Sequence, residues 1–276
     1  WRIGAICLPI NYRLTASEVL YIVSDAEPKV VFVDREFNCL WNEVLKDFDE
    51  NQLKTISFNS LTKQSDYEDI VKSYSPYKNS NETFFDDQCL LMYSSGTTGL
   101  PKSIVHSAGG TLIQQWKELR LHCNLRKKDT IFYFTTCGWM MWNWLVSSLS
   151  IGSSIVLFDG APFYPDNKML WEIADQLEIS IFGTSAKYID SCEKSGLKPK
   201  NLFRLSKLKT ILSTGSPLSN ENFKYVYENL KKDVHLASIA GGTDLVGCLV
   251  LGNLYSNVYM GEIQGQSLGI DVDVFT

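Results

Sequence analysis

Residues 92–102 read Met-Tyr-Ser-Ser-Gly-Thr-Thr-Gly-Leu-Pro-Lys, and glycine and hydroxyl-bearing residues fill most of this stretch. So many small residues pack poorly and lose much backbone entropy on folding, so the loop needs a functional reason. Backbone N–H groups free of bulky side chains, several hydroxyls and a lysine together suit a polyphosphate. We therefore predict a phosphate-binding loop made of Ser94, Ser95, Gly96, Thr97, Thr98, Gly99 and Lys102.

Two other interpretations compete for the same loop. A surface turn rich in Ser and Thr would share its composition, but the run follows an apolar strand candidate at 89–92, which favours a binding site. A Walker-type nucleotide-binding loop is excluded by the spacing. Pro101 bars a helix at Leu100, and residues 103–105 predict a returning strand.

Two more glycine-bearing segments each follow a strand candidate. Gly215, Ser216 and Pro217 precede a helix candidate, for which Ser219 is a suitable N-cap. The segment Ala240-Gly241-Gly242-Thr243-Asp244 places one carboxylate directly after two glycines. A single carboxylate beside a triphosphate would satisfy Mg²⁺, which prefers one or two carboxylates plus phosphate oxygens.

Strand and helix candidates alternate along most of the chain, which predicts an α/β fold with mostly parallel sheets covered by helices. Ligands in such folds bind beyond the carboxyl ends of the strands, and the loops after Tyr93, Ser213 and Ile239 are expected there. Strands are predicted at 29–34, 90–93, 103–105, 179–182, 208–213 and 234–239, and helices at 15–25 (with a capping box from Thr15 to Glu18), 67–74, 109–121, 169–177, 185–195 and 220–230.

The longest uncharged stretch, residues 130–158, is not expected to cross a membrane. About 20 apolar residues would suffice for a spanning helix, but Thr, Ser, Asn and Gly interrupt this stretch at short intervals. We predict instead a buried strand–helix–strand unit, with strands at 130–136 and 153–158 and a helix at 140–150.

Composition restricts the function classes further. The 276 residues are 45% hydrophobic and 21% charged, as in ordinary globular proteins, and the net charge of −5 argues against a nucleic-acid or anionic-membrane partner. Seven scattered cysteines without a CxxC pair indicate reduced thiols and a cytoplasmic (cytosolic) location, and they offer no zinc site. The sequence does not specify an oligomeric state.

The eleven-residue loop resembles the phosphate-binding signature of the adenylate-forming superfamily, which contains acyl-CoA synthetases, luciferases and peptide-synthetase adenylation domains. This resemblance implies that the loop, with Lys102, holds the β- and γ-phosphates of ATP. The Gly215–Pro217 segment resembles the loop that walls the adenine, and residues 240–244 resemble the family's Gly-x-Thr-Glu element. There Thr243 would contact phosphate and Asp244 would bind Mg²⁺, although Asp is one methylene shorter than the family's Glu.

Three longer stretches, at 135–144, 182–190 and 234–244, narrow the resemblance to acetoacetyl-CoA synthetases from about residue 87 onward. Residues 1–60 resemble general fatty acyl-CoA ligases, so another short- or medium-chain acid stays open as the substrate. The narrower resemblance implies acetoacetate, ATP and coenzyme A as small-molecule substrates. It also implies an acyl pocket lined by Trp139, Met140 and Gly241.

Gly241 carries a further expectation about the depth of that pocket. In relatives that make acetyl-CoA a tryptophan stands at the position of Gly241 and closes the pocket. A glycine would leave room for a four-carbon acid, so a Gly241→Trp substitution is expected to shift preference toward acetate.

Two expectations concern the histidines and the extent of the domain. His106, His122 and His235 are assigned mainly structural or surface roles, although His106 could approach the phosphate loop. Residues 1–276 are expected to be a partial AMP-binding domain with a polar, linker-like stretch near 60–87, and without the small C-terminal catalytic domain. Such a fragment would fold at least partly but would not complete the ligase reaction, which leaves a catalytically incomplete nucleotide-binding fragment as the alternative.

Overall fold

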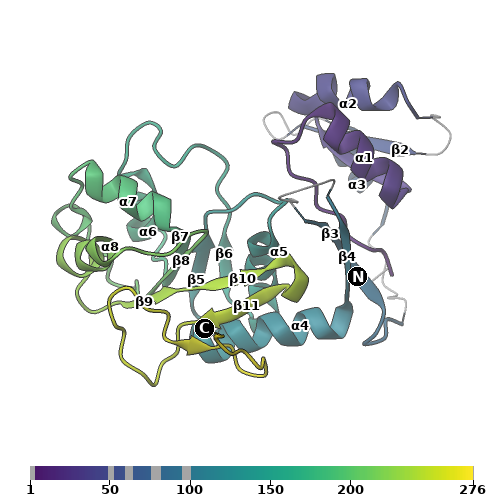
Figure 1. Ribbon diagram of the computed structural model, residues 1–276. Helices are drawn as coiled ribbons and strands as arrows, with labels where there is room; N and C mark the ends of the chain where they lie inside the picture. Colours follow the sequence, from purple (N-terminus) through teal and green to yellow (C-terminus); the bar gives the residue numbers. More distant parts are fainter. Residues whose placement is uncertain (1–3, 49–52, 60–64, 76–81, 95–100, 276) are drawn as a thin grey trace.

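The computed structural model describes residues 4–48, 53–59, 65–75, 82–94 and 101–275 (Figure 1). Its centre is a five-stranded sheet in the order β6-β5-β7-β8-β9, in which every neighbouring pair is parallel. The predicted α/β fold with a mostly parallel sheet is therefore confirmed. The strands are β5 (Thr130–Tyr133), β6 (Ser154–Val156), β7 (Ile181–Ser185), β8 (Thr210–Thr214) and β9 (His235–Ser238).

Both faces of this sheet are buried, because successive side chains point to opposite sides and both sets are apolar. Phe182, Ile211 and Leu236 are paired across three strands and face one core, whereas Ile181 and Leu212 face the other. Helices α6 (Met169–Gln176), α7 (Ala186–Lys194) and α8 (Asn220–Tyr225) contribute to the first core. Helix α5 (Met140–Ser147) and the end of α4 (Ala108–Lys117, continued by a π-turn at Glu118–His122) contribute to the second.

Two antiparallel hairpins stand beside the central sheet. β3 (Gln88–Tyr93) pairs with β4 (Ser103–Ser107), which confirms the returning strand predicted at 103–105. β10 (Ala240–Gly242) pairs with β11 (Gly247–Leu251), and β11 pairs with β12 (Gly265–Gln266).

The hairpins correct two expectations about the loops. The segment after Tyr93 was expected at the carboxyl edge of the parallel sheet, but β3 belongs to a separate hairpin. Residues 240–242 were expected to be a loop, but they form a strand, because β11 supplies hydrogen-bonding partners that the local sequence does not announce.

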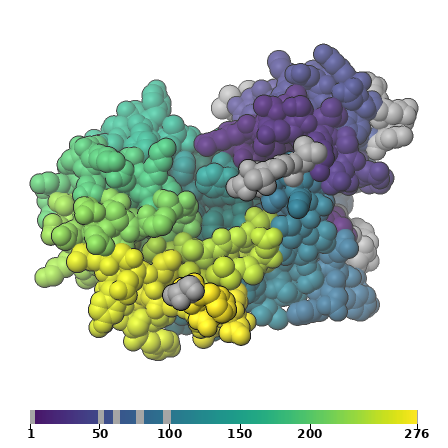
Figure 2. Space-filling view, in the orientation of Figure 1, coloured from purple at the N-terminus to yellow at the C-terminus, as the bar shows by residue number. Residues whose placement is uncertain are grey.

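The N-terminal residues form a small unit with its own core, seen as the purple lobe in Figure 2. The capping box predicted at Thr15 and Glu18 is present and opens the first helix. Helix α3 lies within the stretch predicted as linker-like, of which residues 60–64 and 76–81 lie outside the described residues. The unit contains α1 (Ala16–Ala26), β1 (Val30–Asp34), α2 (Asn38–Leu45), β2 (Lys54–Phe58) and α3 (Asp66–Ser73), and β1 and β2 are parallel.

The uncharged stretch 130–158 forms the predicted strand–helix–strand unit, namely β5, α5 with a short 3₁₀ turn at Ser148–Ile151, and β6. Among the described residues, no helix has both the length and the apolar character that crossing a membrane requires. The seven cysteines all lie in the described part of the chain, and none of them forms a disulfide.

Gly183 in β7 provides a test of how the second core is packed. A Cβ atom on Gly183 would lie 2.0 Å from the ring of Tyr133, its partner on β5, so even a methyl group must displace the ring. Gly183→Ala is expected to lower the free energy of unfolding by about 1–3 kcal/mol, the usual cost of overpacking. Urea unfolding of the complete protein measures this change.

Gly265→Ala is the matched control, because a Cβ atom there would meet only Asn253, at 3.6 Å. Adding Tyr133→Leu to Gly183→Ala should recover part of the lost stability. Equal unfolding free energies for Gly183→Ala and the parent would show that the Tyr133 ring is not closely packed on the strand.

Candidate functional site

The ends of β3 and β4 bring together the two described residues of the predicted phosphate loop. The Ser94 N–H donates to the Lys102 carbonyl at 3.0 Å, and the Lys102 N–H donates to Ser94 Oγ at 3.2 Å. Lys102 is exposed and its ammonium is therefore accessible to an anion. Ser95, Gly96, Thr97, Thr98 and Gly99 lie outside the described residues.

A histidine connects this hairpin to the Thr243–Asp244 segment. Nε2 of His106, on β4, lies 2.8 Å from the backbone carbonyl of Thr243. Sequence reasoning gave His106 mainly a structural role and did not identify its partner, which is 137 residues away. The contact places the strand that follows the phosphate loop directly against the predicted phosphate- and metal-binding turn.

The loop after β8 lies beside the same segment. Thr214 Oγ1 donates to the Ile239 carbonyl at 2.9 Å, which joins the end of β8 to the residue before β10. Gly215 has a φ of +86°, a conformation that favours glycine, and Ser216 and Pro217 are exposed. The predicted N-cap is confirmed, because Ser219 Oγ accepts from the Asn222 N–H.

Residues 240–246 form a tight hairpin at the centre of these contacts. Thr243–Leu245 is a single 3₁₀ turn between β10 and β11, and the Asp244 side chain is exposed at its outer side. Val246 ends the turn with φ 49° and ψ 31°, in the left-handed region. That conformation is rare for a β-branched residue, so the surroundings must hold it.

The backbone around Gly241 is more crowded than the predicted pocket depth requires. A Cβ atom on Gly241 would lie 2.1 Å from the Gly247 carbonyl oxygen and 2.6 Å from the Cys248 Cα. The side-chain direction of Gly241 thus points at the paired strand β11 and leaves no open space for a tryptophan. Glycine is needed here for the close approach of the two strands, at the irregularity between Ala240 and Gly241.

The two other predicted pocket residues lie at the start of α5. Trp139 is the N-cap residue of that helix and is 48% exposed, so its indole ring is free to contact a ligand. Met140 is half-buried and packs on the core formed by Cys89, Leu90, Met92 and Val246. Met140 therefore links α5 to the hairpins and carries more of a packing role than Trp139.

Beneath these segments lies a fully buried carboxylate that the sequence analysis did not single out. Glu118 accepts from the Cys248 N–H at 2.8 Å, from Gln114 Nε2 at 2.7 Å and from Trp144 Nε1 at 2.9 Å. Burial raises the pKa of Glu118, and the hydrogen bond from Cys248 and the charge of Lys117 oppose that rise. Burial has the opposite effect on Lys117 and lowers its pKa, because Lys117 is charged when protonated. Its ammonium lies 3.8 Å from the Glu118 carboxylate.

The other two histidines have the structural roles expected of them. Nδ1 of the buried His122 lies 2.8 Å from the Gly252 carbonyl, and its Nε2 accepts from the Leu268 N–H. Nε2 of His235 lies 2.6 Å from Oε1 of Gln264.

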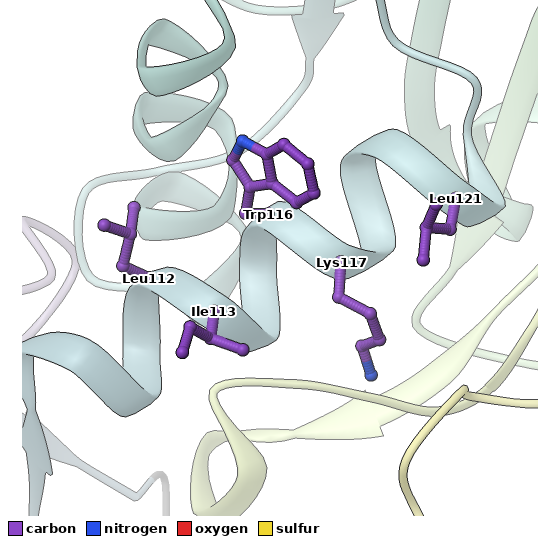
Figure 3. Close-up of a pocket in the computed structure, with 5 residues that line it drawn as sticks. All are labelled: Leu112, Ile113, Trp116, Lys117 and Leu121. Atoms are coloured by element: carbon purple, nitrogen blue, oxygen red, sulfur yellow. The ribbon is translucent and has the colours of Figure 1, made fainter.

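An apolar groove of about 420 Å³ lies on the outer side of α4 (Figure 3). It is formed by one helix and by side chains other than the predicted site residues, so it is not a candidate for the phosphate or acyl site. Its lining residues are Leu112, Ile113, Trp116, Lys117 and Leu121.

Asp244 is the candidate metal ligand, and its surroundings fit a weakly held cation. Within the described part of the chain, no group of three or more His, Cys, Asp or Glu side chains is arranged to hold a metal ion. A single exposed carboxylate suits Mg²⁺ that takes its remaining ligands from phosphate oxygens and water.

Comparisons with known proteins identify similar sequences and structures. A family model described as AMP-binding enzyme matches residues 1–268. The acetoacetyl-coenzyme A synthetase of Rhizobium meliloti (strain 1021) is 56% identical over 191 residues, and that of Gallus gallus is 51% identical over 191 residues. Each match covers 69% of this chain and 29% of the relative, so the chain spans less than a third of their length. The solved structure of an acetoacetyl-CoA synthetase from Streptomyces lividans has a TM-score of 0.85 and 33% identity, over 92% of this chain and 42% of that chain.

The close approach at Gly241 generates a prediction. Gly241→Ala is expected to disrupt the β10–β11 pairing and lower the thermal unfolding midpoint, because its methyl group would overlap the Gly247 carbonyl. Gly242→Ala is the matched control for stability, since a Cβ atom there would meet only Asp244 Oδ2, at 3.7 Å. If Gly241→Ala unfolds at the parent temperature, the strands do not approach as closely as the structure indicates.

Proposed function

Because this chain belongs to the AMP-binding enzyme family, we propose that the complete protein uses ATP to convert acetoacetate to acetoacetyl-CoA. The observation that supports this most strongly is that three separate segments meet at residues 239–246. His106 of the β3–β4 hairpin lies against the Thr243 carbonyl, Thr214 at the end of β8 donates to the Ile239 carbonyl, and Met140 at the start of α5 packs with Val246. Each carries residues that resemble an element of adenylate-forming enzymes.

The proposed reaction has two steps. A carboxylate oxygen of acetoacetate attacks the α-phosphorus of ATP, the bond to the bridging oxygen breaks, and pyrophosphate leaves to give the acyl adenylate. The sulfur of coenzyme A then attacks the acyl carbon, and AMP leaves as the thioester forms. The attacking carboxylate is already a nucleophile, so the protein needs no activated Ser or Cys.

The residues of this chain would act by positioning and by neutralising charge. Lys102 is exposed at the base of the phosphate loop and would contact the phosphates together with the loop N–H groups. Thr243 would contact phosphate from the turn that His106 holds. Gly215, Ser216 and Pro217 would wall the adenine base, and Ala240, Gly241 and Gly242 would complete that side through their backbone.

Mg²⁺ would supply charge neutralisation for the leaving pyrophosphate, and Asp244 is the residue that would hold it. Asp244 lies on an exposed turn one residue from Thr243, so one carboxylate and the phosphate oxygens could share the ion.

The acid is proposed to be acetoacetate because two relatives of that printed name share 56% and 51% identity with this chain. Trp139 could donate its indole N–H to the keto oxygen, since the ring is 48% exposed at the start of α5. The resemblance of residues 1–60 to fatty acyl-CoA ligases favours another short- or medium-chain acid as the second candidate. Comparing pyrophosphate release with acetoacetate, acetate and butyrate by the complete protein separates the two.

A cytosolic location and small-molecule partners belong to the same proposal. Seven cysteines without a disulfide fit a reducing compartment, and a net charge of −5 argues against a nucleic-acid partner.

Substitutions in the phosphate loop test the nucleotide role. In the complete protein, Thr97→Ala and Lys102→Ala should each slow acetoacetate-dependent pyrophosphate release roughly a hundredfold to a thousandfold, because each removes a contact to developing charge. The thermal unfolding midpoint should change little for Lys102→Ala, since the side chain is exposed. Parent rates in both variants would contradict the assignment of this loop.

Asp244→Asn tests the metal role. The substitution removes the charge but keeps the shape, so the Mg²⁺ concentration for half-maximal pyrophosphate release should rise sharply. Measuring the rate against Mg²⁺ at fixed ATP gives this value. A Mg²⁺ dependence equal to that of the parent would mean that Asp244 is only a turn residue.

A further inference from the structure

Helix α4 and its π-turn bury a stripe of polar residues. Thr111, Gln115, Glu118 and His122 follow one another at intervals of four, three and four, which places them on one helical face. All four side chains are at least 96% buried. Apolar side chains between them, such as Ile113 and Trp116, are instead exposed; both are among the groove residues labelled in Figure 3.

The buried stripe contacts the backbone that follows the Thr243–Asp244 turn. Gln115 Nε2 donates to the Val246 carbonyl at 3.1 Å, and Glu118 Oε1 accepts from the Cys248 N–H at 2.8 Å. Further along, Nδ1 of His122 lies 2.8 Å from the Gly252 carbonyl. Successive residues of one helical face thus hold the residue before β11, a residue within it and the residue after it.

The first of these contacts lies at the strained residue. Val246 holds a left-handed conformation, and its N–H bonds back to the Thr243 carbonyl to close the turn that carries Asp244. The Gln115 amide holds the Val246 carbonyl, while the Val246 side chain is buried against Leu90 and Met92. A backbone in such a conformation persists only when several contacts determine it.

The Gln115 and Glu118 side chains also contact α5, the helix at whose start the predicted acyl pocket lies. Ser147 donates to Gln115 Oε1, and Trp144 Nε1 donates to Glu118 Oε2 at 2.9 Å. Helix α4 begins directly after β4, the strand that follows the phosphate loop. Gln115 and Glu118 therefore join the three elements that carry the predicted phosphate, metal and acyl contacts.

The geometry points to Gln115 and Glu118 as positioning residues that hold the Thr243–Asp244 turn in its reactive place. This inference rests on the proposed function, because it assigns the turn a role in binding phosphate and Mg²⁺. Both side chains are fully buried. Each acts through the backbone of Val246 or Cys248.

Gln115→Met in the complete protein is the first test. Methionine keeps the length and most of the volume but removes the donor to Val246. The rate of pyrophosphate release should fall roughly tenfold to a hundredfold, as expected when a reacting group is displaced by about 1 Å. The Mg²⁺ concentration for half-maximal rate should rise, while the KM for acetoacetate stays within about twofold, because Trp139 and Met140 lie at the opposite end of α5 from Ser147.

The measurements are made well below the thermal unfolding midpoint of each variant, so that loss of folded protein cannot imitate the effect. Gln176→Met is the matched control, because Gln176 is exposed on α6 and its amide donates to Glu172 of the same helix. If Gln115→Met fails to fold, Glu118→Gln gives a second test, with Glu172→Gln as its control, because the one amide oxygen cannot accept from both the Cys248 N–H and Trp144 Nε1. A raised Mg²⁺ requirement is expected there as well.

Asp244→Asn is measured in parallel, so that a failure of the positioning role can be distinguished from a failure of the proposed function. If Asp244→Asn raises the Mg²⁺ requirement and Gln115→Met or Glu118→Gln does not, the positioning role is wrong and the proposed function stands. If Asp244→Asn behaves as the parent, the assigned role of the turn fails, and the positioning role fails with it. A loss confined to thermal stability in both α4 variants would also overturn the inference.

Discussion

The Glu118 carboxylate lies fully buried between α5 and β11, and a buried charge is tolerated only when donors saturate its oxygens. Its donors come from α4, α5 and β11, namely Gln114, Trp144 and the Cys248 N–H. Withdrawing a partner from a buried charge typically costs about 3–5 kcal/mol. The requirement to satisfy one side chain therefore fixes the relative placement of three elements, and each of them borders the candidate site.

The candidate site depends on that placement because its parts belong to different sheets. The Gly215 loop comes from the parallel sheet, whereas Ser94 and Lys102 come from the β3–β4 hairpin. They meet through residues 239–246, where the Ile239 carbonyl accepts from Thr214 and the Thr243 carbonyl lies 2.8 Å from His106 Nε2. A left-handed residue other than glycine costs roughly 1–2 kcal/mol. At Val246 burial and the Gln115 bond offset that cost.

The N-terminal unit has a separate core, but it contacts β3, one of the strands that border the candidate site. Cys7 forms a parallel bridge to Leu90 of β3, and Tyr93 donates its hydroxyl to Asp25 of α1 at 2.6 Å. A Cβ atom on Gly138 would lie within 2.6 Å of Asn11, so this unit packs closely on the turn before Trp139. Residues that resemble general acyl-CoA ligases thus border the segment proposed to recognise the acid, which gives the N-terminal unit a route to influence substrate choice.

The sequence by itself determined the features that depend on close neighbours. The capping box at Thr15, the N-cap at Ser219, the alternation of strands and helices and the glycine-bearing loops all follow from residues within a few positions of one another. The tertiary structure decided which strand pairs with which, and so moved the Tyr93 loop from the parallel sheet to a hairpin and turned Gly241 toward β11. It also decided that α4 buries its polar stripe. The spacing of Gln115 and Glu118 places them on one helical face. The polar face of a helix normally lies toward solvent, so the sequence alone would not indicate that this face is buried. The groups that satisfy these side chains lie about 130 residues further along the chain, where no local pattern reaches.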